Sequence, residues 1–406
     1  MIKKFENKEN LENLNTSVNS ENENSQNSQQ ENLPTSFDEM GLNTNLLRGI
    51  YGYGFEVPSP IQQQAIIPII NGLDLIGQAQ SGTGKTAAFA IGTLQKINPM
   101  LLGVQTLVLA PTRELAIQIY LVYTFLSEFM NLKIHLAIGG TAVKNDILKL
   151  QEGAHIVVGC PGRILDMIKK NFLLLNDLNS LILDEADEML QKGFLESFKD
   201  IVSYIPPTCK ILLFSATLNK EVLALTDLFM ENPEKILVEK EKLTLKGIKQ
   251  YYVLLKKADK LDILMQIYSG IEIAQAIIYC NSKGSVDFLT NEMQKRGHRV
   301  SSIHSEKKQC ERNEIMKDFR CGATRVLITT DLLARGIDVY QVSLVINYEL
   351  PREKDTYLHR IGRSGRFGRK GTAINFVTPD EKEDLETLQK FYDTIIVALP
   401  TDLSEM

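Results

Sequence analysis

One stretch of the chain combines residues that bind phosphate. It reads Ala79-Gln80-Ser81-Gly82-Thr83-Gly84-Lys85-Thr86, the P-loop pattern with alanine at the usual first glycine. Glycines at positions 82 and 84 allow a tight loop whose backbone N–H groups point at phosphate oxygens. Lys85 is placed to neutralise the β- and γ-phosphates, and Thr86 to offer its hydroxyl to Mg²⁺. The pattern predicts a nucleotide site but does not say how the energy is used.

A second group of polar residues follows a short apolar run. Leu181-Ile182-Leu183 leads directly into Asp184-Glu185-Ala186-Asp187. A carboxylate at the end of a strand beside a P-loop can hold Mg²⁺, which is the role expected of Asp184. Glu185 is then placed to orient or deprotonate the water that attacks the γ-phosphate. An acidic surface loop is the alternative, and the P-loop upstream argues against it.

The elements that must position these groups alternate along the chain. Leu73–Ile76 before the P-loop predicts a strand, and Ala87–Ile91 after it predicts a helix. Further apolar runs predict strands at Thr106–Leu109, Ile134–Ile138, His155–Val158, Leu181–Leu183 and Ile211–Phe214, with longer helix-like segments between them. Such alternation favours an α/β fold with a parallel sheet covered by helices on both faces. Ligands of such sheets bind at the carboxyl ends of the strands, where the groups above fall.

The second half of the chain repeats the alternation without a second P-loop. Strands are predicted at Ala276–Tyr279, Val300–Ile303, Val326–Ile328, Leu344–Ile346 and Ala373–Val377. A stretch rich in Lys and Glu, residues 239–247, predicts a linker between the halves. This half is therefore not expected to bind phosphate on its own.

Composition sets further limits. The chain has 406 residues, 44% of them hydrophobic and 23% charged, as in an ordinary globular protein. Residues 1–35 are rich in Asn, Glu, Ser and Gln, which predicts a disordered tail. The five cysteines show no CxxC spacing, which predicts reduced thiols in the cytosol or nucleus.

The net charge of −5 excludes a basic surface over the whole molecule, so nucleic acid would need a local patch. Arg360–Lys370 is one candidate, although charge alone is equally typical of a solvated loop.

Several motifs in order resemble the DEAD-box RNA helicases. They are Gly54–Gln62, the P-loop, Pro111–Ala116, Pro161–Arg163, Asp184–Asp187, Ser215–Thr217, Thr329–Asp331, Ala334–Asp338 and His359–Arg366. The resemblance runs from Phe37 nearly to the C-terminus. It implies two tandem RecA-like domains, each a parallel sheet with helices on both faces. The expected division is a tail at 1–35, a Q-motif region at 36–64, an ATP-binding domain at 65–238, a linker at 239–247 and a C-terminal domain at 248–406.

The resemblance also assigns residues to an ATP site that closes between the domains. Lys85, Glu185, Arg363 and Arg366 would be catalytic, the two arginines as fingers that reach the γ-phosphate. Thr86 and Asp184 would hold Mg²⁺, and Asp187, Ser215 and Thr217 would couple hydrolysis to RNA. Nucleotide would be bound by Phe37, Phe55, Gln62, Ala79, Gln80, Ser81, Gly82, Thr83, Gly84, Lys85, Thr86 and Asp338. In this set Gln62 would read adenine, Phe37 or Phe55 would pack near the base, and Asp338 would contact the ribose.

RNA would be held through its backbone by matched positions in both domains. These are Thr112, Arg113, Gly139, Gly140, Gly162 and Arg163 in the first, and Gln309, Arg312 and Thr329 in the second. Two departures from the family pattern fall here. Cys160 stands where the family usually has Thr, and His304-Ser305-Glu306 replaces His-Gly-Asp. Both put the expected RNA contacts of those positions in doubt.

Within the family, Thr329–Tyr348 is very similar to the branch that serves translation initiation. That likeness implies a cytoplasmic enzyme, monomeric outside complexes, with RNA and a scaffold protein as partners and no membrane. Tyr279-Cys280-Asn281 and Ser364 resemble the branch that clamps RNA in the exon junction complex or acts on pre-ribosomal RNA, which would be nuclear. An ATP-gated RNA clamp therefore remains an alternative to an unwinding enzyme. A P-loop kinase or motor unrelated to RNA is disfavoured by the run HRIGRSGR.

Overall fold

The predicted alternation of strands and helices is confirmed in both halves of the chain. A computed structural model describes residues 33–79, 82–191, 193–218, 220–237, 248–270, 274–331, 342–364 and 371–400. The tail up to residue 32, the linker at 239–247 and the predicted site residues Gln80, Ser81, Asp338 and Arg366 lie outside the described residues. The elements below belong to one compact unit, Thr35–Met406.

The first lobe is built on a seven-stranded parallel sheet with the order β3-β4-β2-β5-β6-β1-β7. Its strands are β1 (Leu75–Gln78), β2 (Thr106–Leu109), β3 (Ile134–Ala137), β4 (Ile156–Gly159), β5 (Ser180–Asp184), β6 (Lys210–Ser215) and β7 (Glu234–Leu237). β1 begins two residues later than predicted. The reason is Asp74, whose carboxylate accepts from the Ile211 N–H at 2.8 Å and the Glu231 N–H at 3.2 Å. The side chain therefore fixes the entry to the sheet instead of extending the strand.

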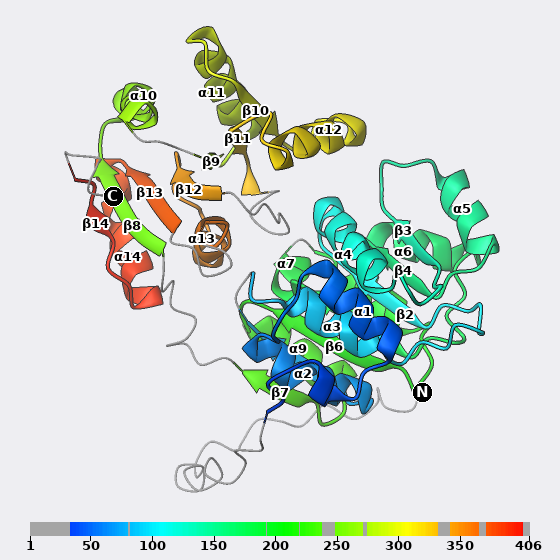
Figure 1. The fold of residues 1–406 in the computed structure, drawn as a ribbon. Helices are drawn as coiled ribbons and strands as arrows, with labels where there is room; N and C mark the ends of the chain where they lie inside the picture. The colour runs from blue at the N-terminus through cyan, green and yellow to red at the C-terminus, as the bar shows by residue number, and fades with distance from the viewer. Residues whose placement is uncertain are drawn as a thin grey trace, which may run out of the picture. The chain divides into compact units, whose positions relative to one another are not determined.

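Helices cover both faces of this sheet (Figure 1). They are η2 (Asp38–Met40), α1 (Thr44–Tyr53), α2 (Pro60–Ile70), α3 (Lys85–Leu94), α4 (Arg113–Leu126), α5 (Val143–Gln151), α6 (Pro161–Lys169), α7 (Ala186–Gln191), α8 (Leu195–Val202) and α9 (Lys220–Phe229). Successive strand residues point to opposite faces. Along β6, Leu212 and Phe214 therefore join one core with α1–α4, while Ile211 and Leu213 join the other with α6 and α8.

The second lobe repeats the topology of the first. Its strands are β8 (Ile248–Leu254), β9 (Gln275–Tyr279), β10 (Val300–Ile303), β11 (Val326–Thr329), β12 (Val342–Asn347), β13 (Gly371–Val377) and β14 (Val397–Ala398). The order β10-β11-β9-β12-β13-β8-β14 is the order of the first sheet when the strands are counted from β8. All pairings are parallel. The chain thus contains two RecA-like domains in tandem, as the resemblance implied.

Helices again flank the second sheet. They are η3 (Lys257–Asp259), α10 (Lys260–Gly270), α11 (Lys283–Lys295), α12 (Gln309–Arg320), α13 (Lys354–Ile361), η5 (Pro379–Glu381) and α14 (Lys382–Tyr392). Ile277 and Leu327 face the core that includes α12–α14, whereas Ile278 and Ile328 face the core with α10 and α11. Across the described parts of both lobes, every helix is too short or too polar to span a membrane.

Candidate nucleotide and RNA site

The P-loop joins the end of β1 to the start of α3. Gly82 and Gly84 have φ values of 85° and 96°, in the left-handed region that glycine adopts at little cost. Lys85 begins α3 and is only 5% exposed. Its Nζ donates to the Ala79 carbonyl at 2.8 Å, across the loop. The loop is therefore closed by its own lysine, with Thr83 and Thr86 beside it in the sequence.

Gln62 lies against this loop from α2. Its Oε1 accepts from the Ser59 N–H at 2.8 Å, and its Nε2 donates to the Gly84 carbonyl at 3.3 Å. A Cβ on Gly84 would lie 2.5 Å from that Nε2, and the φ of 96° at this position favours glycine in any case. A primary amide keeps one further lone pair and one further hydrogen. Gln62 can therefore still exchange two hydrogen bonds with a base.

The predicted aromatic neighbours of the base differ in exposure. Phe37 is fully buried and contacts the rings of Tyr51 and Phe55, each at a centroid distance of 6.4 Å. Phe55 is half-buried and its ring lies 4.9 Å from that of Tyr53. Phe55 has surface to offer a base, whereas Phe37 supports it from the core. The nucleotide contacts of both residues stay predictions.

The acidic residues after β5 face the P-loop lysine. Glu185 Oε1 lies 3.6 Å from Lys85 Nζ, and both side chains are buried. Glu185 has a φ of 51°, which is rare for a residue with a Cβ, and its N–H donates to Asp184 Oδ1 at 3.0 Å. Burial, and then the charge of Glu185, raise the pKa of Asp184 to about 7. Asp184 and Thr86 carry oxygen atoms, the ligand type that Mg²⁺ requires, so these residues fit the predicted metal.

The predicted coupling residues form one connected group. Thr217 donates to Asp187 Oδ2 at 2.8 Å, and Ser215 donates to the Thr217 carbonyl at 2.8 Å. The sequence did not assign a role to the next member, His359 of α13. Its Nε2 lies 3.5 Å from Asp187 Oδ2, and both side chains are fully buried. The signal for His359 was its place at the start of HRIGRSGR.

The arginines of that run are not solvated where the structure describes them. Arg360 is fully buried, donates to Asn347, Asn281 and the Glu349 carbonyl, and pairs with Asp331. Arg363 is 2% exposed, and its Nε donates to the His359 carbonyl at 3.1 Å. The interpretation as a solvated basic loop is therefore wrong for these two side chains. The finger role of Arg363 stays a prediction.

Most of the predicted RNA residues line one pocket of about 620 Å³. Its lining includes Thr112, Arg113, Gly139, Gly162, Arg163 and Arg312, together with the two departures, Cys160 and Ser305. Gln309 is also near, because its Oε1 accepts from Arg113 at 3.2 Å. A Cβ on Gly140 would lie 2.7 Å from Arg113 Nη1, so this glycine lets the arginine approach. We call this pocket the RNA pocket after the RNA contacts that the resemblance assigns to these residues, and those contacts stay a prediction.

Thr329 does not join this pocket. It ends β11 fully buried, and its hydroxyl lies 2.9 Å from the Ile303 carbonyl and 3.1 Å from the Thr330 carbonyl. In this structure its hydroxyl is therefore used inside the second lobe. An RNA contact from Thr329 stays a prediction.

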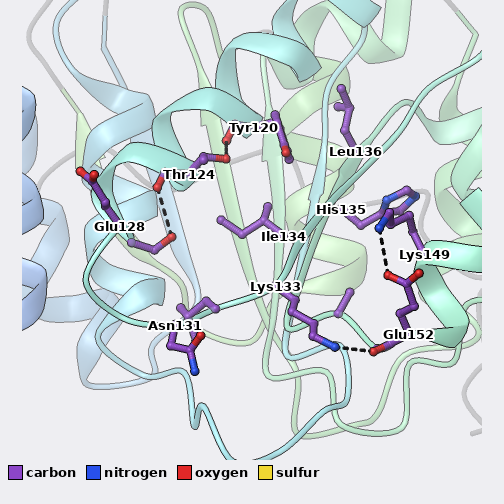
Figure 2. A pocket seen from close by; sticks show the side chains of 14 residues that line it. Tyr120, Thr124, Glu128, Asn131, Lys133, Ile134, His135, Leu136, Lys149 and Glu152 are labelled. Atoms are coloured by element: carbon purple, nitrogen blue, oxygen red, sulfur yellow. Dashed lines mark hydrogen bonds and ion pairs between the residues drawn. The ribbon is translucent and has the colours of Figure 1, made fainter.

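A second depression lies along the edge strand β3 (Figure 2). Its volume is about 840 Å³, and it is lined by residues of α4, β3 and the end of α5, including Tyr120, Ile134, His135 and Lys149. Figure 2 shows Lys133 bonded to the carbonyl of Glu152, at 2.7 Å. We call it the β3 groove. None of the predicted site residues lines it.

The repeated topology and the single P-loop define a class of protein, the nucleotide-dependent enzymes with two RecA-like domains. Comparison with known families narrows the class. Residues 59–225 match the DEAD/DEAH box helicase family, and residues 259–368 match the helicase conserved C-terminal domain.

Individual relatives are similar to this chain over nearly its whole length. The protein named "ATP-dependent RNA helicase eIF4A" of Neurospora crassa is 53% identical, covering 91% of this chain and 94% of that one. Its namesake in Neosartorya fischeri is 52% identical over 93% of this chain and 95% of that one. S. cerevisiae Dbp5 bound to RNA and ADP BeF3 superposes with a TM-score of 0.86 at 37% identity, covering 92% of this chain and 97% of that one. This chain belongs to the DEAD/DEAH box helicase family.

Proposed function

We propose that this chain is an ATP-dependent RNA helicase that couples ATP hydrolysis to RNA binding and opens short duplexes during translation initiation. The observation that carries the proposal is the position of two acidic residues, Glu185 and Asp187, two apart in the sequence. Glu185 lies 3.6 Å from the P-loop lysine, and Asp187 lies 3.5 Å from His359 of the second lobe. One turn of chain thus contacts both the phosphate site and the lobe that carries the arginines.

The chemistry follows from these positions. Lys85 neutralises charge on the β- and γ-phosphates, and Glu185 orients the attacking water and takes up its proton. Thr86 and Asp184 would hold Mg²⁺, which when bound would supply further neutralisation of phosphate charge. Arg363, together with Arg366, stabilises the charge that develops on the γ-phosphate. Such a finger contributes on the order of 10³ to 10⁵ in rate, so turnover is slow until both lobes engage the nucleotide.

RNA is held by its backbone in the RNA pocket. Phosphate and 2′-hydroxyl contacts carry little sequence information, so the enzyme acts on RNA of many sequences. Because nucleotide and RNA both favour the closed arrangement, each strengthens the binding of the other. A groove that bends one strand separates a short duplex locally.

The names of the relatives support the translation branch. We further propose a scaffold protein as partner and the cytoplasm as location, as the resemblance to that branch implies. Asn281 and Ser364, which resemble the exon-junction and pre-ribosomal branch, have local roles in this structure. Asn281 accepts from Arg360 at 2.7 Å, and Ser364 donates to the Ile361 carbonyl at 2.8 Å. Their presence is thus explained without that branch. We also propose the domain division at 65–238 and 248–406.

The test measures ATP turnover with and without single-stranded RNA, and strand separation of a short duplex with ATP. We expect RNA to stimulate turnover and ATP to drive separation. A rate of ATP turnover that does not change when RNA is added would overturn the proposal. RNA binding that needs ATP, without strand separation, would instead identify a clamp. A pull-down with the full chain then distinguishes a translation scaffold from a splicing-deposited complex.

A further inference from the structure

Arg163, predicted to contact RNA, is largely occupied by protein acceptors. Its Nη2 donates to the Thr141 carbonyl at 3.0 Å, and its Nη1 lies 3.3 Å from the Thr141 hydroxyl. Nη1 also donates to Asp146 Oδ2 of α5. The side chain of Arg163 is only 10% exposed. Its main contacts are therefore within the first lobe.

These contacts fix the turn that carries Gly139 and Gly140. The Thr141 hydroxyl donates to the Ile138 carbonyl at 2.8 Å, which closes the turn, while it accepts from Arg163. Gly140 has a φ of 84°, and Arg113 lies against the turn, since a Cβ on Gly140 would be 2.7 Å from its Nη1. Arg113 and Arg163 thus both lie against the glycine turn, and both line the RNA pocket.

Asp146 is the acidic partner that holds this arrangement. It is 3% exposed, and its two oxygens face different groups. Oδ2 accepts from Arg163, and Oδ1 lies 3.3 Å from His135 Nε2. Burial lowers the pKa of His135, so its imidazole is neutral near pH 7 and the guanidinium alone balances the carboxylate. His135 also lines the β3 groove (Figure 2), so the network spans the space between that groove and the RNA pocket.

We propose that Asp146 is a positioning residue of the RNA site, acting through Arg163 to hold the glycine turn in the shape that binds the RNA backbone. The proposal rests on the proposed function, because it assumes that the RNA pocket binds RNA. It assigns Arg163 mainly to shaping the turn rather than to contacting phosphate. Removing the carboxylate leaves a buried guanidinium without its charge partner, which favours a different arginine position and a disordered turn.

The test uses the full chain and a fluorescent single-stranded RNA in the presence of a non-hydrolysable ATP analogue. Asp146→Ala should weaken RNA binding by about tenfold or more, within the range for residues of one network. Asp146→Glu, which keeps the charge, should recover most of the affinity. Arg163→Ala should weaken binding similarly, and the double variant should be no weaker than Arg163→Ala alone.

Controls separate positioning from loss of fold. In every variant, the affinity for the ATP analogue without RNA should stay within about twofold of that of the unmodified chain, since the P-loop is not part of this network. Glu152→Gln provides a matched control, because Glu152 is an exposed acid at the end of the same helix. Unchanged RNA affinity in Asp146→Ala, additive losses in the double variant, or equal loss of nucleotide affinity would each overturn the inference. Failure of the unmodified chain to bind RNA would instead contradict the proposed function.

Discussion

Glu185 has a backbone conformation that residues other than glycine rarely adopt. Its φ of 51° costs on the order of 1–3 kcal/mol. The cost is offset by fixed contacts, since Asp184 accepts its N–H and Lys85 lies beside its carboxylate. The strained residue is the one whose carboxylate we propose to orient the attacking water. The conformation thus has a functional explanation: it turns a strand end toward the phosphate site.

Glu185→Gln tests that role directly. The amide keeps the volume and the contact to Lys85 but cannot accept a proton, so nucleotide binding should be retained. Hydrolysis should fall by about 10²- to 10⁴-fold, the usual contribution of a general base. Single-turnover hydrolysis together with equilibrium nucleotide binding measures both quantities. Unchanged turnover would refute the assignment of Glu185 as the base.

His135 gives the first lobe a pH-dependent stability. Burial holds its pKa below the usual 6.5, so the folded chain resists a proton that the unfolded chain accepts. Stability from this residue is present above about pH 6.5, the pKa in the unfolded chain, and is lost as the pH falls from there through the lower pKa of the folded chain. Urea unfolding at pH 7.5 and 5.5 should show the loss, and His135→Gln should reduce the difference. His298→Gln in the second lobe is the control, and an equal reduction there would exclude a specific role for His135.

The positions of residues that follow a motif could be predicted from the sequence, and contacts that depend on distant partners could not. The P-loop and the acidic residues after β5 were placed correctly because short spacing fixes their relation to a strand end. Arg360 was interpreted only as part of a basic run. Its acceptors Asn347 and Asn281 are 13 and 79 residues away in the sequence, so nothing local indicates that it is buried.

Among the elements, α1 and α4 pack unusually closely. A Cβ on Gly49 of α1 would lie 2.0 Å from the Leu126 carbonyl at the end of α4. Only glycine fits at this crossing. Gly52 of the same helix is exposed, and a Cβ there would meet no atom within 4 Å. The two glycines therefore have different reasons for being in one helix.

Gly49→Ala should destabilise the chain by about 1–3 kcal/mol, because the added methyl forces the helices apart. Gly52→Ala should be neutral or stabilise by up to about 1 kcal/mol, since alanine is the better helix former. Chemical denaturation of the two variants measures both effects. Equal effects of the two substitutions would show that the crossing is not tightly packed.

The strand predictions missed β7, β8 and β14. β7 and β14 are sheet edges, and β7 carries Glu234 and Lys235 exposed to solvent. β8 lies inside the second sheet but contains Gln250, whose buried amide bonds with Thr394 and Tyr357. Partners more than 100 residues away make that polar residue compatible with a strand. An apolar pattern alone could not have found it.

At the scale of the whole molecule, side chains from both RecA-like domains contact each other in the part of the chain that the structure describes. Among the described residues, Arg312 of α12 lies 3.0 Å from Glu114 of α4, and both are buried. Gln309 accepts from Arg113 nearby, and His359 contacts Asp187 at the phosphate end. Removing one partner of a buried ion pair is costly, because the other charge remains without compensation. The Glu114–Arg312 pair should therefore stabilise the closed arrangement that brings the second lobe to the nucleotide.

Glu114→Gln should weaken the coupling between nucleotide and RNA without affecting the P-loop. Coupling is the factor by which an ATP analogue tightens RNA binding, typically 5- to 150-fold in coupled systems. In the variant this factor should fall toward one, while analogue affinity without RNA stays unchanged because Glu114 is outside the nucleotide site. Because coupling is reciprocal, the factor by which RNA tightens binding of the ATP analogue should fall by the same amount. Glu128→Gln, an exposed acid just past α4, is the control. If Glu114→Gln retained the full coupling factor in both directions, the closed arrangement would have to depend on other contacts, such as that of His359 with Asp187.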